Sequence, residues 1–120
     1  MTKVGEGDRA PKMPTQKTYH RDLEHSALKF ENALEAFAQS KNGEDKTRLK
    51  AVMDEQLQLI QQAVNEIKIK QIHKQGEKVV KDYNQYIQNS TEEHFAALEH
   101  DIQTLRDYNQ ISTPNPKLKT

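Results

Sequence analysis

The fold of this chain is decided by residues 45–89, which read DKTRLKAVMDEQLQLIQQAVNEIKIKQIHKQGEKVVKDYNQYIQN. On a helix that turns about 100° per residue, the apolar side chains fall on two stripes that are rotated by roughly 130° from one another. The first stripe contains Leu49, Val52, Met53, Leu57, Ile60, Val64 and Ile67. The second stripe contains Ile69, Ile72, Val79, Val80, Tyr83, Tyr86 and Ile87. Supercoiling shifts a stripe by only about 20° per heptad, so these residues face two partners or form a broken helix.

Gly76 is the candidate position for such a break, because it lies inside the second stripe. A glycine in a helix interior costs about 1 kcal/mol, and it breaks a helix less readily than proline does. Three interpretations stay open: a tolerated glycine, a kink, or a close approach by another helix. For the long stretch as a whole, we expect a continuous or gently bent helix.

Two shorter helices are predicted on either side of the long stretch. Residues 19–41 place Tyr19, Leu23, Ala27, Phe30, Leu34 and Phe37 on one helix face. Residues 91–109 place Phe95, Leu98, Ile102 and Leu105 on another. We expect Thr18 to cap the first helix, Asp45 or Thr47 to cap the second, and Ser90 to cap the last. The turn at residues 42–43 predicts an antiparallel hairpin between the first two helices.

These elements predict an all-α fold, a three-helix antiparallel bundle with a long central helix. The outer helices pack against different halves and different sides of the central one. We expect residues 1–18 to form a disordered tail, residues 19–111 the helical bundle and residues 112–120 a second disordered tail.

The composition excludes several classes of protein. Hydrophobic residues make up 33% of the chain and charged residues 30%, and 18 basic residues balance 18 acidic ones. Because the net charge is zero, no long-range field directs the protein to nucleic acid or to an anionic membrane. The chain has no cysteine, which excludes disulfides, thiol nucleophiles and thiolate metal sites. No stretch is apolar enough for a signal peptide or a membrane span, so the expected location is the cytoplasm.

The sequence gives no sign of an active site, so we predict that the protein is not an enzyme. The five histidines are the candidates for metal or acid–base chemistry. His94 and His100 do not share a helix face, and Asp22 with His25 forms the single pair at carboxylate–histidine metal spacing. We interpret each histidine as a solvated surface residue, and we expect no metal site and no cofactor.

The favoured function is a non-catalytic protein–protein interaction module, such as an adaptor, chaperone-like or assembly protein. The chain carries more amphipathic helix than its own mass covers, so the partner is another protein or a second copy in a homodimer. The predicted contact surface is Ile69, Ile72, Val79, Val80 and Tyr83. The alternative is binding to nucleic acid or an acidic surface through a lysine stripe, formed by Lys70, Lys74, Lys78 and Lys81. Arginine and interleaved aromatic residues are scarce there, so nucleic acid is the less favoured partner.

Overall fold

The structure is a computed structural model that describes residues 15–112. Within this range the chain forms four helices and no strand: α2 (Gln16–Gln39), α3 (Gly43–Glu66), α4 (Lys70–Gln88) and α5 (Glu92–Ser112). The all-α prediction is confirmed, but the predicted number of three helices is wrong. Most of the two predicted disordered tails lies outside the described residues.

The predicted long central helix is two helices, and the break lies at Ile67–Ile69 rather than at Gly76. Ile67 ends α3 with φ −81° and ψ 129°, and Ile69 precedes α4 with φ −132° and ψ 113°. Both residues are therefore extended. The break coincides with the change of stripe, because Ile67 is the last residue of the first stripe and Ile69 the first of the second. Ile67 is fully buried, and burying such a side chain contributes about 2 kcal/mol, which helps to offset the helical hydrogen bonds that the break removes.

Gly76 lies within α4 and marks a close approach by α3. A Cβ atom added to Gly76 would lie 3.1 Å from Cγ1 of Val64. The interpretation of Gly76 as a contact point between helices is thereby confirmed, and the interpretation as a kink is wrong.

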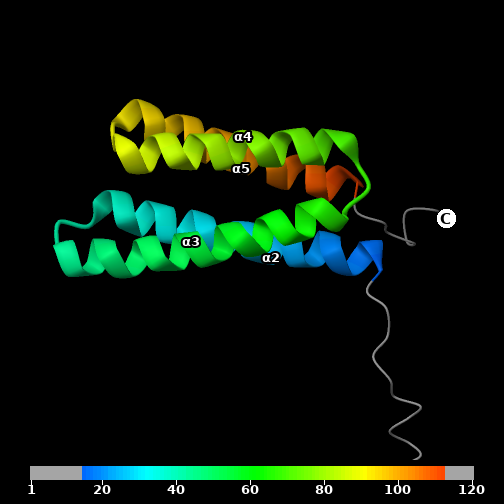
Figure 1. The fold of residues 1–120 in the computed structure, drawn as a ribbon, viewed down its shortest axis with the longest axis horizontal. Helices are drawn as coiled ribbons and strands as arrows, with labels where there is room; N and C mark the ends of the chain where they lie inside the picture. Colours follow the sequence, from blue (N-terminus) through cyan, green and yellow to red (C-terminus); the bar gives the residue numbers. More distant parts are fainter. Residues whose placement is uncertain (1–14, 113–120) are drawn as a thin grey trace, which may run out of the picture.

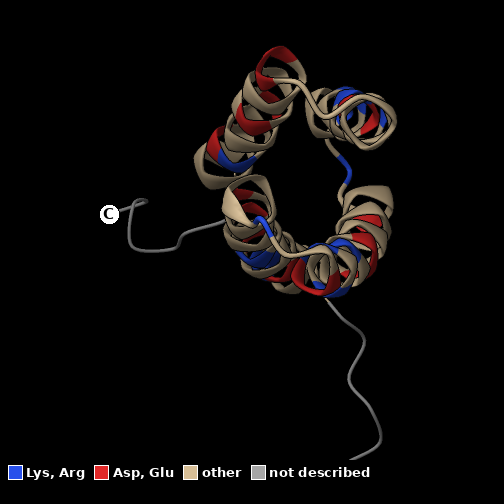
Figure 2. Cartoon of the chain, turned by 90° about the vertical axis from the view of Figure 1, so that its left-hand side faces the viewer, with Lys and Arg blue, Asp and Glu red and all other residues tan. Residues whose placement is uncertain are grey.

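The four helices form two antiparallel hairpins that pack against one another (Figure 1). Helices α2 and α3 form one hairpin, as the turn at residues 42–43 predicted, and α4 and α5 form the other. An end-on view shows the helices in a ring, in which α2 lies beside α5 and α3 lies beside α4 (Figure 2). Of these neighbouring pairs, α3 and α4 pack least closely.

Aromatic side chains join the two hairpins through the core. The rings of Phe30 in α2 and Tyr83 in α4 meet edge to face, with centroids 5.6 Å apart. Phe37 and Tyr86 repeat this arrangement at 5.8 Å, and Phe95 of α5 contacts Tyr86 at 6.1 Å. Edge-to-face pairs of this kind contribute about 1 kcal/mol beyond the apolar area that they bury. Tyr83 and Tyr86 of the second stripe are therefore covered by the chain itself.

The first two helices begin at caps other than those predicted. Helix α2 starts earlier than expected, because Thr15 rather than Thr18 is its N-cap and accepts the backbone N–H of Thr18. Asn42 caps α3, and its Oδ1 atom accepts the backbone N–H groups of Glu44 and Asp45. A side-chain oxygen in this role satisfies donors that the first helical turn cannot pair internally.

The last helix is capped by Thr91 instead of Ser90. Thr91 Oγ1 accepts the backbone N–H of His94 at 3.1 Å. The hydroxyl of Ser90 instead donates to the carbonyl of Tyr86, near the end of α4. The α4–α5 turn is thus held from both sides by hydroxyl groups.

Candidate functional site

The candidate site is the groove between α3 and α4, where neighbouring helices pack least closely. Its floor is apolar and is formed by Ile60 and Val64 of α3 and by Gly76 and Val80 of α4. Ile60 and Val64 are 1% and 6% exposed, whereas Val80 is only partly buried. At Gly76 the absence of a side chain lets Val64 lie close to the α4 backbone. We call this feature the α3–α4 groove.

The rim of the α3–α4 groove carries mainly amide side chains. The lining residues beyond the floor are Gln61, Asn65, His73, Glu77, Lys81, Asn84, Gln85 and Gln88. The amide groups are exposed and both donate and accept hydrogen bonds. Glu77 and Lys81, one turn apart on α4, are the two oppositely charged groups of the rim. The groove therefore offers an apolar floor between walls that carry mainly uncharged amides and one charge of each sign.

The structure divides the five residues of the predicted contact surface into two groups. Ile72 and Val79 are fully buried and Tyr83 is 4% exposed. Ile69 and Val80 are partly buried and pack against the core. Val80 is the member of the set that lines the groove. The other buried members belong to the core in this conformation and are not accessible to a partner.

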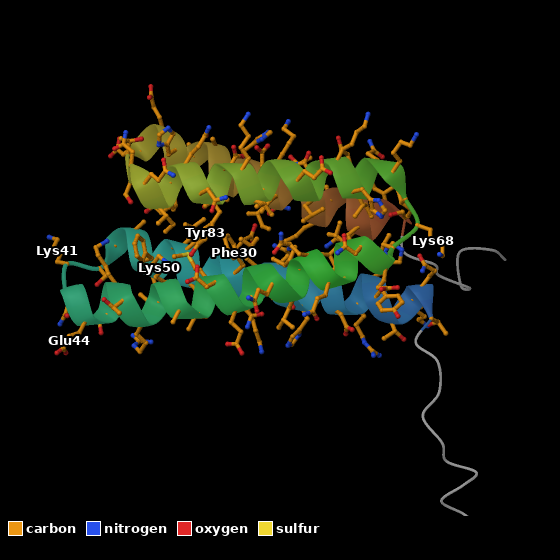
Figure 3. All side chains as sticks on the ribbon, viewed as in Figure 1. Phe30, Lys41, Glu44, Lys50, Lys68 and Tyr83 are labelled. Carbon is orange, nitrogen blue, oxygen red and sulfur yellow. The ribbon has the colours of Figure 1, made fainter. Side chains whose placement is uncertain are left out.

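Tyr83 illustrates why this part of the second stripe is closed. Its ring packs against Phe30 between the two hairpins (Figure 3). Its hydroxyl donates a hydrogen bond to Oδ1 of Asp54 on α3. Burial and the adjacent Asp54 carboxylate raise the pKa of Tyr83 above its usual value, so the phenol stays protonated as the donor at neutral pH.

The four lysines of the predicted stripe are all exposed on α4. Nitrogen-tipped side chains project from the outer edge of this helix (Figure 3). The stripe is not purely basic, since Lys78 and Lys81 act electrostatically on Asp82, and Lys78 also acts on Asp101. These two carboxyl groups reduce the positive potential at the end of the stripe.

Asp82 and Asp101 form a carboxyl pair between α4 and α5. Burial and a hydrogen bond with Asp101 raise the pKa of Asp82 from 3.8 to about 6. Burial would also raise the pKa of Asp101, but the hydrogen bonds from Asp82 and His100 lower it. At a pH between these two pKa values, the two groups therefore share one proton, which Asp82 holds and donates to Asp101.

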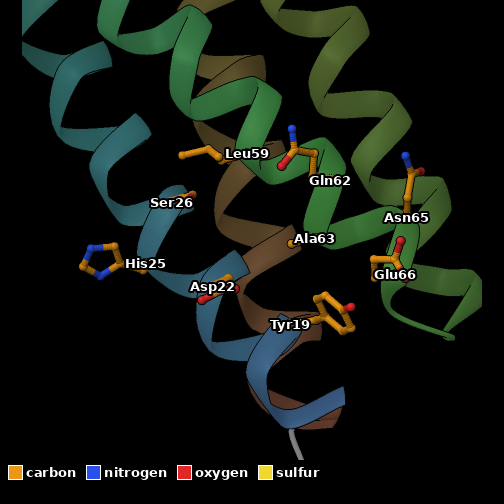
Figure 4. Close-up of a pocket in the computed structure, with 9 residues that line it drawn as sticks. All are labelled: Tyr19, Asp22, His25, Ser26, Leu59, Gln62, Ala63, Asn65 and Glu66. Carbon is orange, nitrogen blue, oxygen red and sulfur yellow. The ribbon is translucent and has the colours of Figure 1, made fainter. Parts of the chain in front are cut away.

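A second hollow, of about 540 Å³, lies between α2 and α3 (Figure 4). Asp22, His25 and Ser26 line it and are residue types that nucleophilic catalysis uses. Figure 4 shows the His25 ring pointing away from Ser26 and Asp22. Among the hydrogen bonds of residues 15–112, none joins these three side chains. They do not form a catalytic relay in this structure.

Comparisons of the chain with protein families, with curated proteins and with solved structures found no match. In residues 15–112, no helix is long and apolar enough to cross a membrane. The same residues contain no group of three or more histidine, cysteine or acidic side chains that could hold a metal ion. Function is therefore inferred from the chemistry of the surface itself.

Two polar clusters between α2 and α5 were missed by the sequence analysis. Arg106 donates to Glu24 at 2.6 Å and to Glu31 at 2.7 Å. His20 is 2% exposed, which corrects its interpretation as a surface residue, and its Nδ1 lies 2.7 Å from Oδ1 of Asn109. Asn109 in turn donates to the backbone carbonyl of His20 at 2.9 Å.

A signal for these clusters exists in the sequence. His20 precedes Leu23 by three residues and Asn109 follows Leu105 by four, so each extends an apolar stripe. Polar residues at stripe positions are expected to be buried and to have partners.

Proposed function

We propose that this protein is a non-catalytic interaction module that binds an amphipathic helix of a partner protein in the α3–α4 groove. The observation that carries the proposal is the position of Val80, which is partly exposed beside the buried Ile60 and Val64 of the floor. Grooves between helices commonly bind a third helix through apolar residues spaced three or four positions apart.

The rim of the groove suggests the chemistry of the partner. Uncharged amides at Gln61, Asn84 and Gln85 favour a helix whose apolar ridge is flanked by polar residues. Glu77 and Lys81 provide one charge of each sign, one turn apart along α4. A partner helix with a basic residue opposite Glu77 and an acidic one opposite Lys81 would bind in a single direction, because charge pairs determine orientation more than affinity.

We expect the module to act by binding alone, as an adaptor, chaperone-like or assembly protein. Catalysis needs titratable groups that converge in a pocket. The groove instead offers mainly aliphatic and amide side chains, and its titratable groups, His73, Glu77 and Lys81, lie along its rim. Its shape and chemistry are those of a docking surface.

The test is quantitative capture of partners from the native cell with three baits: the wild type, Val80→Asp and Leu28→Asp. Leu28 is 44% exposed on α2 and is absent from the groove lining, so its variant is a matched apolar-to-acid control. We expect mass spectrometry to find a protein that the Val80 variant loses and the Leu28 variant retains. Equal capture by all three baits, with native helicity, would contradict the proposal.

A second candidate function is binding to nucleic acid or to an acidic protein surface. It is favoured by the exposure of Lys70, Lys74, Lys78 and Lys81 on one helix. Binding through phosphate contacts would weaken steeply with added salt. If the double variant Lys74→Glu, Lys78→Glu binds a nucleic-acid probe as well as the wild type does, the stripe is not the site.

A further inference from the structure

The linker between the two hairpins is unusual in its residue types. Ile67–Ile69 joins two helices without a glycine or a proline, and the described residues include none with positive φ. Ile69 occupies the N-cap position of α4 and makes no side-chain cap. The chain therefore leaves the helix here without the residues that normally stop one.

The same residues are compatible with a continuous helix. Isoleucine and lysine cost less than about 0.7 kcal/mol each in a helix interior. A helical linker would pair the N–H groups of residues 68–71 with the carbonyls of residues 64–67. We call the structure described above the closed form, because the two hairpins of one chain pack against each other. In this form the N–H of Lys68 donates to the side chain of Gln16, and it is the only one of these four N–H groups that is bonded to a side chain.

The contacts that join the hairpins do not depend on the linker. They are the ion pairs of Arg106 with Glu24 and Glu31, the His20–Asn109 cluster, and the contacts of Tyr83 with Phe30 and Asp54. Each contact joins α2 or α3 to α4 or α5. A second copy of the chain can supply the same surface in the same geometry.

We propose that two copies of this chain form a dimer by exchanging their α4–α5 hairpins. Residues 43–88 of each copy then form one helix, and each hairpin packs against the complementary hairpin of the other copy. The inference is independent of the proposed partner helix, because α3 of one copy and α4 of the other line each groove of the dimer.

Two side chains stabilise the closed form relative to the exchanged dimer. Gln16 donates to the carbonyl of Glu66 at 2.8 Å and accepts the N–H of Lys68 at 3.0 Å. The ring of His73 hydrogen-bonds to the carbonyl of Ile67. In a continuous helix these two carbonyls accept backbone N–H groups instead. Removal of either side chain therefore favours exchange.

The experiment measures oligomeric state for the wild type and three variants by light scattering after size exclusion, over a range of concentrations. Gln16→Ala removes two hydrogen bonds of about 1 kcal/mol each from both closed chains, so the dimer should bind roughly a thousandfold more tightly. Lys70→Pro suits the closed form, since Lys70 is the first residue of α4, where a proline is well tolerated. Proline inside a continuous helix costs about 3 kcal/mol, and the dimer contains two such helices, so this variant should weaken the dimer by about ten-thousandfold or more. Lys70→Ala is the control for the lost charge.

A distance measurement then distinguishes exchange from simple docking of two closed bundles. The chain has no cysteine, so spin labels at Thr47→Cys and Gln88→Cys report one distance. Both positions are exposed, at the start of α3 and the end of α4. Labelled chains are refolded with an excess of unlabelled chains, so that each dimer carries at most one labelled copy. In the closed form the labels lie at the same end of the bundle, whereas a continuous helix separates them by about 60 Å at 1.5 Å per residue.

The proposal predicts a dimer in which the two labels are about 60 Å apart. The fraction of dimer should increase with Gln16→Ala and fall to zero with Lys70→Pro, while the helicity of the protein stays unchanged. A dimer with the short distance would overturn it. So would a protein that stays monomeric at every concentration, the Gln16 variant included.

Discussion

Gly76 of α4 lies so close to Val64 of α3 that a Cβ atom on the glycine would be 3.1 Å from Val64 Cγ1 and 3.3 Å from Cγ2. Both residues line the floor of the α3–α4 groove. Their contact explains a glycine in the middle of a helix, where alanine would otherwise be more stable by about 1 kcal/mol.

Replacement of Gly76 by alanine therefore has opposing effects. The gain in helix propensity is about 1 kcal/mol, and overpacking against Val64 costs about 1–3 kcal/mol. We expect Gly76→Ala to lower the free energy of unfolding slightly in the wild type. In a Val64→Ala background the clash is absent, and the same change should stabilise by about 1 kcal/mol. Urea denaturation of the four proteins measures both effects, and an unchanged sign in the two backgrounds would contradict the contact.

Arg106 stabilises the α2–α5 interface through two carboxylates. Its side chain is 17% exposed, and that of Glu31 is 15% exposed. Burial raises the pKa of Glu31, and the charge of Arg106 opposes this effect. We expect Arg106→Met to destabilise the protein by about 2 kcal/mol, less than for a fully buried pair, because Glu31 keeps some contact with water.

The control for this prediction is the double variant Arg106→Met, Glu31→Gln. Removing the unpaired charge should restore part of the lost free energy of unfolding. If the single and double variants are equally stable, Glu31 is hydrated rather than buried.

The carboxyl pair of Asp82 and Asp101 predicts a dependence of stability on pH. In the folded protein the pKa of Asp82 is raised from 3.8 to about 6, so between these values the folded state holds a proton that the unfolded state releases. The contribution of Asp82 to stability is therefore present at low pH and is lost as the pH rises toward 6. The lowered pKa of Asp101 acts in the opposite direction.

Asp82→Asn isolates this effect, since the amide donates to Asp101 at every pH. We expect Asp82→Asn to have a higher Tm than the wild type above pH 6, and a difference that shrinks toward pH 4. Lys78 and Lys81 attract the ionised Asp82 and so reduce this difference, because Asp82→Asn removes that attraction as well. A Tm difference that does not vary with pH would contradict the shared proton.

Asn109 provides a test of the buried cluster with His20. Asn109→Ala leaves the His20 ring and its backbone carbonyl without these partners in a site that is 1–2% exposed. Loss of the cluster should cost about 2 kcal/mol. Asn32→Ala, at an exposed position of α2, should change the free energy of unfolding by less than about 0.5 kcal/mol.

Periodicity in the sequence was sufficient to predict the helical class, the two hairpin pairings and most of the core. It did not predict the break at Ile67–Ile69, because no local residue stops the helix there. That break is stabilised by contacts distant in sequence, namely the burial of Ile67 and the bonds of Gln16. The signal for the break was the rotation between the two apolar stripes. That rotation reflected two separate helices rather than one helix that faces two partners.

The prediction of the contact surface was incomplete for the same reason, since most of its residues are buried in the core. A stripe shows which residues are apolar but not which helix covers them. Once the chain folds back at Ile67–Ile69, Phe30 covers Tyr83, and Val80 stays partly exposed beside Gly76. Such a result depends on tertiary packing, which the spacing of residues alone does not define.

The role of the α3–α4 groove is tested most directly by site-specific photo-crosslinking in the native cell. A photoreactive residue at Asn84 lies on the groove rim, and one at Asn32 lies on the exposed surface of α2. We predict a discrete adduct with one protein from position 84, none from position 32, and loss of the adduct when Val80→Asp is added. No adduct from position 84, or the same adduct from both positions, would contradict the assignment of the groove as the binding surface.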